Sequence, residues 1–143
     1  MPTRRIREVI AHQTVLTATR DVSVREAARR MARARVGAIM VVDDERLVGI
    51  FTERDALVRV LAAGLDTEAT RLDQVMTANP LAAGPDLPLG HALHMMYDGG
   101  FRHIPIVDSG RPVGMVSARD ALGPELAAFE SELQRRDAIT ELL

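Results

Sequence analysis

The chain contains one sequence pattern twice. Residues 24–57 read VREAARRMARARVGAIMVVDDERLVGIFTERDAL, and residues 89–122 read LGHALHMMYDGGFRHIPIVDSGRPVGMVSARDAL. The two segments align without a gap at an offset of 65 residues, for example from Gly49 to Gly114. Two copies are too few for a solenoid, in which at least three repeats cover one another. The repeat therefore predicts a tandem pair of like units that pack about a pseudo-two-fold axis.

Each copy shows the same order of secondary-structure signals. Ser23 and Glu26 form a capping box at a helix start, and apolar residues follow at helical spacing. Two apolar runs joined by a polar turn then predict a hairpin. The predicted elements are an extended segment at 14–17 and 81–83, a helix at 24–35 and 89–99, hairpin strands at 38–42, 47–51, 103–107 and 112–116, and a second helix at 53–63 and 118–122. The predicted fold class is α/β, of the α+β type, with two β-α-β-β-α repeats.

Glycine and proline mark the limits of the two units. We expect a first unit at 6–64, which ends at Gly64 as a helix cap, a linker at 65–71, and a second unit at 72–122. Residues 123–143 begin with Gly-Pro and continue as a predicted amphipathic C-terminal helix. Because this helix lies outside both repeats, it must pack on the pair or on another subunit.

The composition argues against several classes of function. The net charge is −2, whereas a nucleic-acid-binding domain is usually basic. The absence of cysteine excludes disulfides, thiolate nucleophiles and Cys-ligated zinc. His91 and His94 share a predicted helix, but the only further ligands on offer are His103 and scattered carboxylates. The chain also lacks a Walker loop, an HExxH motif and a supported Ser-His-Asp set. We therefore expect no metal site and no enzyme activity.

No segment predicts export or a membrane span. The N-terminus has basic residues but no apolar signal-peptide core. The longest apolar run, around residues 38–42, is far shorter than the roughly 20 residues that cross a bilayer. We therefore expect a cytoplasmic protein.

A hydroxyl and a carboxylate recur three residues apart where the second hairpin strand of each copy meets a helix. These are Thr52 with Asp55, and Ser117 with Asp120. A hydroxyl at a helix start suits a phosphate, and a carboxylate one turn later can accept both hydroxyls of a ribose diol. The alternative is that both pairs are only helix caps, which are common. Because the pattern recurs at the same offset, we favour binding, although both roles can hold together.

The stretches "VVDDERLVGIFTERDAL" and "IPIVDSGRPVGMVSARDAL", with "VMTANPLAA" opening the second copy, resemble the CBS domain. Two such domains in one chain resemble a Bateman module, and the resemblance covers roughly residues 6–122. Members of that family bind AMP, ADP, ATP, S-adenosylmethionine, NAD and other ligands, and some have no known ligand. The resemblance thus implies a fold more specifically than it implies a ligand.

The resemblance also implies which residues would hold an adenosyl ligand. Thr52, Asp55, Ser117 and Asp120 would bind ribose and phosphate, and basic residues at the phosphate end would include Arg102 and His103. Arg54 and Arg119 could reach a phosphate or, alternatively, face solvent. By the same resemblance the adenine would be flanked by the backbone around Thr17, Ile39, Leu81, Ala82, Ile104 and Pro105.

The two copies differ at the phosphate end. Where the second copy has Arg102 and His103, the first has Gly37 and Ala38. We therefore expect unequal sites, with the Asp120 site the better phosphate binder. If the phosphate end lies near the pseudo-two-fold axis, however, Arg102 would contact the phosphate bound at the opposite site, that of Asp55.

The sequence predicts a regulatory module that binds an adenine nucleotide in clefts between its repeats and reports to an unidentified regulated protein. The alternative is a structural or interaction protein that dimerises without nucleotide. A homodimer is expected in either case, because the second helices and the C-terminal helix carry surplus apolar residues. These residues are Leu57, Val60, Leu61, Leu122, Leu126 and Phe129.

Overall fold

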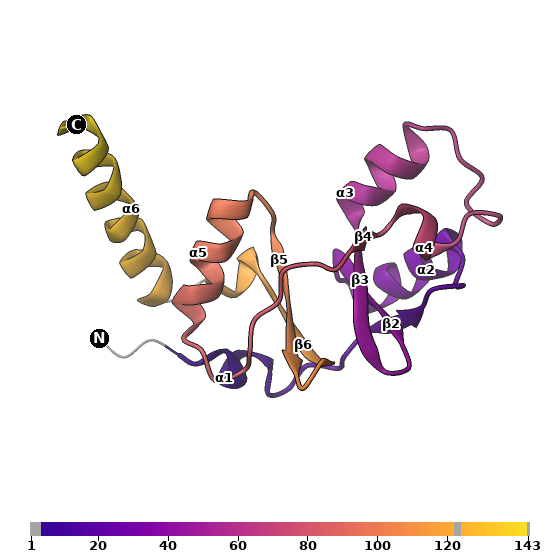
Figure 1. Cartoon of the computed structure of the whole chain (residues 1–143), viewed down its shortest axis with the longest axis horizontal. Helices are drawn as coiled ribbons and strands as arrows, with labels where there is room; N and C mark the ends of the chain where they lie inside the picture. Colours follow the sequence, from indigo (N-terminus) through magenta and orange to yellow (C-terminus); the bar gives the residue numbers. More distant parts are fainter. Residues whose placement is uncertain (1–3, 122–123, 143) are drawn as a thin grey trace.

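The computed structural model describes residues 4–121 and 124–142 (Figure 1). The elements are α1 (Ile6–Ile10), β1 (Thr17–Thr19), α2 (Val24–Ala34), β2 (Ala38–Asp43), β3 (Arg46–Thr52), α3 (Glu53–Asp55), the π-helix η1 (Ala56–Leu61), α4 (Leu72–Val75), β4 (Thr77–Ala78), α5 (Leu89–Gly99), β5 (His103–Asp108), β6 (Arg111–Ser117), the 3₁₀ turn η2 (Ala118–Ala121) and α6 (Pro124–Leu142). The predicted order of helices and hairpins is confirmed in both repeats.

The strands form two small sheets. In the first half the order is β1-β2-β3-β4, with β1 parallel to β2 and the other pairs antiparallel. In the second half β5 pairs with β6, and Ala83 adds a parallel bridge to Ile106. At the repeat offset of 65 residues, this bridge is equivalent to the pairing of Ala18 with Val41 in the first half. The two halves are therefore built alike, although the first strand of the second half is reduced to one bridge.

Several predicted boundaries were wrong. The first strand lies at Thr17–Thr19 instead of 14–17, and the second helix of the second repeat is only the turn η2. Neither α1 nor β4 was predicted, because both are too short to show a period. Val60 was expected on the surface, but it is 1% exposed and belongs to the first core.

Each half has its own apolar core, and the two cores use equivalent residues. Two pairs illustrate this, namely Ala27 with Ala92 and Met31 with Met96, all of them buried. The equivalence holds because each repeat turns the same helix face and the same strand face inward. Aliphatic side chains and methionines fill most of both cores, as the scarcity of aromatic residues predicts.

The two halves exchange a short helix. Ile6 and Ile10 of α1 pack in the core of the second half, whereas Leu72 and Val75 of α4 pack in the core of the first. Figure 1 shows α1, from the start of the chain, lying under α5 and β6, while α4 lies beside α2. Each core is therefore completed by the short helix that directly precedes the other repeat in the sequence.

Backbone hydrogen bonds repeat this exchange on both sides. The amide of Ile6 donates to the carbonyl of Leu87 over 2.9 Å, and that of Leu72 donates to Val22 over the same distance. In the opposite direction, Leu89 donates to Arg4 and Val24 donates to Thr70. These bonds measure 2.8 and 2.9 Å. The equivalent bonds place α1 and α4 in matching positions about the pseudo-two-fold axis.

The glycine that recurs in each repeat makes room for the exchanged helix. A Cβ atom on Gly114 would lie 2.7 Å from Cβ of Ile10 in α1. A Cβ atom on Gly49 would lie 2.3 Å from the sulfur of Met76, just after α4. Real Cβ atoms do not approach other atoms so closely. A larger residue at position 114 would therefore displace Ile10 of α1, and one at position 49 would force the flexible side chain of Met76 to move.

The C-terminal helix α6 packs on α5, as one of the two predicted alternatives requires. The ring of Phe129 meets His94 edge to face with centroids 5.0 Å apart, and Tyr97 at 5.9 Å. His94 also contacts the carboxylate of Glu132. Leu122 lies outside the described residues, as does the side chain of Leu126. None of the described helices is long and apolar enough to cross a membrane.

Replacing Gly114 by alanine is expected to destabilise the protein by about 1–3 kcal/mol, because the new methyl overlaps an inner atom of Ile10. Gly90→Ala is the matched control, since nothing lies within 4 Å of a Cβ there. It should leave stability unchanged or raise it by up to about 1 kcal/mol, because glycine is a poor helix former. Urea unfolding of both variants tests this, and equal stability would contradict the packing of α1 on β6.

Candidate functional site

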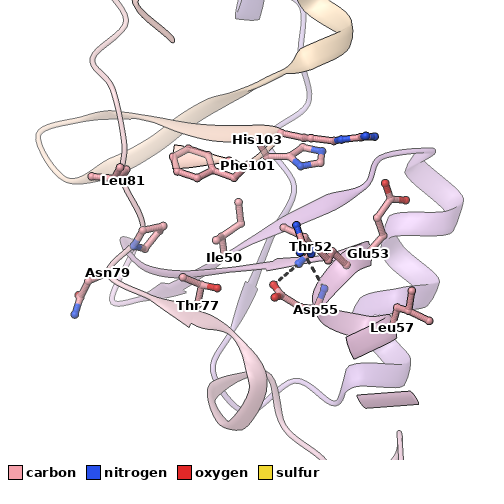
Figure 2. A pocket seen from close by; sticks show the side chains of 14 residues that line it. Ile50, Thr52, Glu53, Asp55, Leu57, Thr77, Asn79, Leu81, Phe101 and His103 are labelled. Carbon is pink, nitrogen blue, oxygen red and sulfur yellow. Dashed lines mark hydrogen bonds between the residues drawn. The ribbon is translucent and has the colours of Figure 1, made fainter. Parts of the chain in front are cut away.

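A cavity of about 650 Å³ opens between the two halves where β3 passes into α3. Its walls come from three segments: the end of β3 with α3, the stretch from β4 to Leu81, and the turn from Gly100 to His103. Figure 2 shows Phe101 and His103 on one wall and Thr52 and Asp55 on the other. Both halves therefore contribute to one cavity.

Thr52 and Asp55 form a reciprocal pair at the start of α3 (Figure 2). The amide of Asp55 donates to Thr52 Oγ1 over 3.1 Å, and the amide of Thr52 donates to Asp55 Oδ2 over 2.9 Å. The other carboxylate oxygen of Asp55 lies 3.6 Å from Nε of Arg59. The capping interpretation is thus confirmed for this pair, and the same pair lines the cavity.

Ser117 and Asp120 repeat only part of this pair. The amide of Ser117 donates to Asp120 Oδ2 over 2.7 Å, and its hydroxyl lies 3.4 Å from the same oxygen. The element that follows is a single 3₁₀ turn. The second motif therefore caps a much shorter element than the first.

The phosphate end predicted from Arg102 and His103 lies at the junction of the halves. Both residues line the large cavity, and both also line a second hollow of about 400 Å³. The second hollow further contains Ser117 and Arg119. The placement at the cavity of Asp55 agrees with the alternative in which Arg102 serves the opposite site.

The structure brings together only part of the predicted set. Thr52, Arg54, Asp55, Leu81, Arg102 and His103 line the large cavity, and Ser117 and Arg119 line the second hollow. The remaining predicted residues line neither; they are Thr17, Ile39, Ala82, Ile104, Pro105 and Asp120. Ile39 and Ile104 are fully buried core residues, so only their backbone could take part in binding.

Sequence reasoning missed several lining residues. Phe101 supplies an aromatic surface, and Ile50 and Leu57 supply aliphatic ones. Asn79 has a left-handed backbone with φ of 49°. No local pattern predicts these positions, because their role depends on how the two halves meet. Of these residues, Phe101 was the one that the sequence could best have indicated, since aromatic residues are rare in this chain.

The side chains of the cavity divide into three kinds. The aliphatic and aromatic residues can flank a flat apolar group, and the carboxylate of Asp55 with the hydroxyl of Thr52 can bind a diol. Arg54 and Arg102 can neutralise an anion. The described residues contain no group of three histidines or carboxylates that could hold a metal ion.

His103 is the one histidine of the cavity, and its pKa is lowered. Burial is the main cause, because it disfavours the charged imidazolium. Arg119 and Arg102 lower the pKa of His103 further, whereas the carboxylates of Glu53 and Asp120 oppose the shift. The surroundings of His103 therefore favour its neutral imidazole form.

Comparison with known families gives one clear result. The pattern of the CBS domain matches residues 6–62 and again residues 72–123. The chain belongs to the CBS domain family. The resemblance noted in the sequence is thus confirmed, and the chain carries a pair of CBS domains.

Relatives of this CBS pair include much longer proteins. CBS domain-containing protein CBSCBSPB5 of Arabidopsis thaliana is 35% identical over 125 residues, which cover 87% of this chain and 23% of the relative. The chain thus spans about a quarter of the length of the first curated relatives that it matches.

Solved CBS structures share the fold. The CBS domain pair of protein MJ0100, in complex with 5′-methylthioadenosine and S-adenosyl-L-methionine, has a TM-score of 0.74 and 28% identity, and the match covers 83% of this chain and 93% of that one. The CBS domain protein PAE2072 from Pyrobaculum aerophilum, complexed with AMP, has a TM-score of 0.80 at 24% identity and covers 90% of this chain and 99% of that one.

In an NMR titration, His103 of this CBS pair should titrate with a midpoint below 6.5, because burial and two guanidinium groups disfavour its charged form. The unfolded chain binds this proton at higher pH than the folded chain does. Lowering the pH from 6.5 should therefore cost stability, and His103→Gln should reduce that loss. Glu53→Gln should lower the midpoint further, since Glu53 raises the pKa. A midpoint at or above 6.5 would show that the ring is not buried as described.

Proposed function

We propose that this CBS pair is a non-catalytic regulatory module that binds an adenosine phosphate, of the AMP, ADP or ATP class, in the large cavity. One observation carries the proposal. A single cavity unites an apolar wall, the Thr52–Asp55 pair and the cationic groups of Arg54 and Arg102. Its volume of about 650 Å³ is within the range of small-molecule sites, roughly 300–1,000 Å³.

Each part of the ligand has a matching part of the cavity. Phe101, Leu81 and Ile50 offer the apolar surface that an adenine ring needs. Asp55, with 13% of its side chain exposed, suits the ribose hydroxyls. Arg102 and His103 suit the 5′-phosphate, and a bound phosphate would raise the pKa of His103 towards the charged form.

The relation to MJ0100 supports an adenosyl group in general. That protein is described with methylthioadenosine and S-adenosylmethionine, which share adenosine but differ in charge. S-adenosylmethionine and NAD are therefore the alternative ligands for this chain. The cations around Arg102 favour a phosphate over a sulfonium ion, because like charges repel.

We assign the stronger phosphate site to Asp55, which reverses the order expected from the sequence. That expectation placed Arg102 and His103 beside Asp120. Both side chains line the cavity of Asp55, whereas Asp120 lines neither hollow. Ligand binding would regulate an unidentified partner protein, because that partner would bind the ligand-free and ligand-bound forms of the module with different affinities.

Asp55→Ala should weaken AMP binding about 10-fold or more, because a charge-assisted hydrogen bond is worth about 1.5–3 kcal/mol. The substitution also removes a helix cap, at a cost of about 0.5–2 kcal/mol of stability. Asp66→Ala is the matched control, since Asp66 caps its own turn by accepting from the amides of Glu68 and Ala69 outside the cavity.

Calorimetry at a temperature where both variants are folded separates the two roles. The proposal expects Asp66→Ala to bind AMP as the natural protein does. If Asp55→Ala also binds AMP normally, Asp55 is only a helix cap. If the natural protein binds no adenosyl ligand, the alternative of an interaction protein without nucleotide is preferred.

We further propose that the module forms a homodimer through the exposed face of η1. Leu57, Val58 and Leu61 are 60%, 55% and 66% exposed there. Three large apolar side chains on consecutive turns are costly to leave in water, and a second copy offers the same surface. Since Leu57 also lines the cavity, such a dimer would lie next to the ligand.

Leu61→Glu should shift the protein towards monomer, because a carboxylate would be buried at the contact. Leu87→Glu is the control, since Leu87 is exposed in the other half and away from η1. Sedimentation velocity at micromolar concentration measures both variants. A natural protein that is monomeric under these conditions would contradict the proposed dimer.

A further inference from the structure

The outer face of α5 is in contact with another helix of the same chain. Phe129 of α6 packs edge to face on the ring of His94. Glu132 also contacts His94, and Arg136 pairs with Asp98 over 3.3 Å. Figure 1 shows α6 alongside α5, on the side of the second half that is away from the first half. An aromatic ring and two charged groups on one face of α6 therefore hold it on α5.

The equivalent face of α2 in the first half is exposed. At the repeat offset of 65 residues, the positions of α5 that α6 contacts correspond to Arg29, Ala32 and Arg33. All three are exposed, as is Ala28, one turn before Ala32. We call these four residues the α2 face. The second half therefore has a helix bound on this surface, whereas the equivalent surface of the first half is open to solvent.

The α2 face carries positive charge that no described side chain neutralises. The other arginines of α2, Arg25 and Arg30, each pair with a glutamate. By contrast, Arg29 and Arg33 make no ion pair and no side-chain hydrogen bond with any residue that the structure describes. They lie four positions apart, where two like charges on a helix repel each other. Arg35, just after α2, lines the second hollow instead.

The alanines of the α2 face leave room for a second helix. Where α5 presents the ring of Tyr97, α2 presents only the methyl group of Ala32. The distance between two packed helices depends on the side chains at their contact, so small residues allow a close approach. A helix that packs over Ala28 and Ala32 would bring its own side chains within reach of the two neighbouring guanidinium groups.

The charges of the two equivalent faces differ, so they fit different helices. On α5 the charged partners of α6 are His94 and Asp98. On α2 both equivalent positions are arginines, which bind carboxylates well. A helix that fits α2 must therefore carry two carboxylates about one turn apart. The natural α6 does not meet this requirement, because its Arg136 would face Arg33.

We propose that the α2 face binds an acidic amphipathic helix of a partner protein, packed as α6 is packed on α5. Two carboxylates of that helix would face Arg29 and Arg33, and an apolar side chain would cover the alanines. None of the four residues of the α2 face lines the cavity or the second hollow. The inference therefore stands whether or not a nucleotide binds.

A nucleic acid is less well matched to the α2 face than an acidic helix is. The sequence of α2 contains no aromatic residue on which a base could stack. The whole chain has a net charge of −2, whereas nucleic-acid-binding domains are usually basic. A covering helix already lies on the equivalent surface of the second half, and this precedent favours a protein partner.

The sequence of α6 supplies the probe. A synthetic peptide of residues 124–142 with the substitution Arg136→Glu carries carboxylates at positions 132 and 136. Asp98 disfavours its binding to α5, because like charges repel. The peptide of natural sequence is the matched control, since its Arg136 would face Arg33. A scrambled peptide with the composition of the substituted one controls for net charge.

Fluorescence anisotropy of the labelled peptides, at one ionic strength, measures binding to the full chain and to two double variants. Arg29→Ala/Arg33→Ala removes the cations of the α2 face. Arg30→Ala/Arg111→Ala removes the same charge elsewhere, since both of these arginines pair with glutamates. Alanine is a good helix former, so the variants of α2 should fold, and urea unfolding checks this.

The Arg136→Glu peptide should bind the natural protein about 10-fold more tightly than either control peptide, because two matched ion pairs form. Arg29→Ala/Arg33→Ala should weaken this binding about 10-fold, and Arg30→Ala/Arg111→Ala should change it by no more than about two-fold. A protein with Arg33→Glu should reverse the preference and bind the natural peptide more tightly, because the carboxylate then faces Arg136.

Three results would overturn the proposal. Equal binding of the three peptides, or binding that survives Arg29→Ala/Arg33→Ala, would show that the α2 face is not the site. A short DNA duplex that binds as tightly as the peptide and depends on the same arginines would assign the face to nucleic acid. Self-association of the natural protein that Arg29→Ala/Arg33→Ala abolishes would assign it to a second copy. Each of these results leaves AMP binding in the cavity untouched.

Discussion

In each half a repeated glycine lets the exchanged segment pack closely on the sheet, and this packing joins the two halves. Ile10 packs against Gly114, and Met76 packs against Gly49. Because α1 completes the second core and α4 the first, neither repeat closes its apolar core with its own residues alone. The cavity depends on this arrangement, since the chain that leaves α4 runs directly along it from Thr77 to Leu81.

The same charged groups act on the cavity and on the second hollow. His103 lies at both, and its pKa responds to the carboxylates of Glu53 and Asp120 and to the guanidinium groups of Arg102 and Arg119. These groups come from both halves, so charge placed at one side of the junction is felt at the other. A regulatory ligand bound there would change the interaction between the halves themselves, which is what a switch requires.

The sequence was sufficient for the architecture and for part of the site. The gapless repeat predicted two like halves, and the spacing of Thr52 and Asp55 identified a pair that does line the cavity. The exchange of α1 was not predictable, because five helical residues carry no period that points to a distant partner. Arg35 was not among the predicted site residues. Only the docking of the halves brings it beside Arg102 and Arg119, and no local pattern encodes that meeting.

The position of α1 also has a consequence for the order in which the chain is made. Gln13, just after α1, exchanges two hydrogen bonds with the backbone of Met115, 102 positions later. During synthesis, Ile6 and Ile10 leave the ribosome long before the residues that bury them exist. Contacts between such distant positions are slow to form, because a large loop must close first. The contacts that bury Ile6 and Ile10 are therefore expected to form after the local contacts within each half.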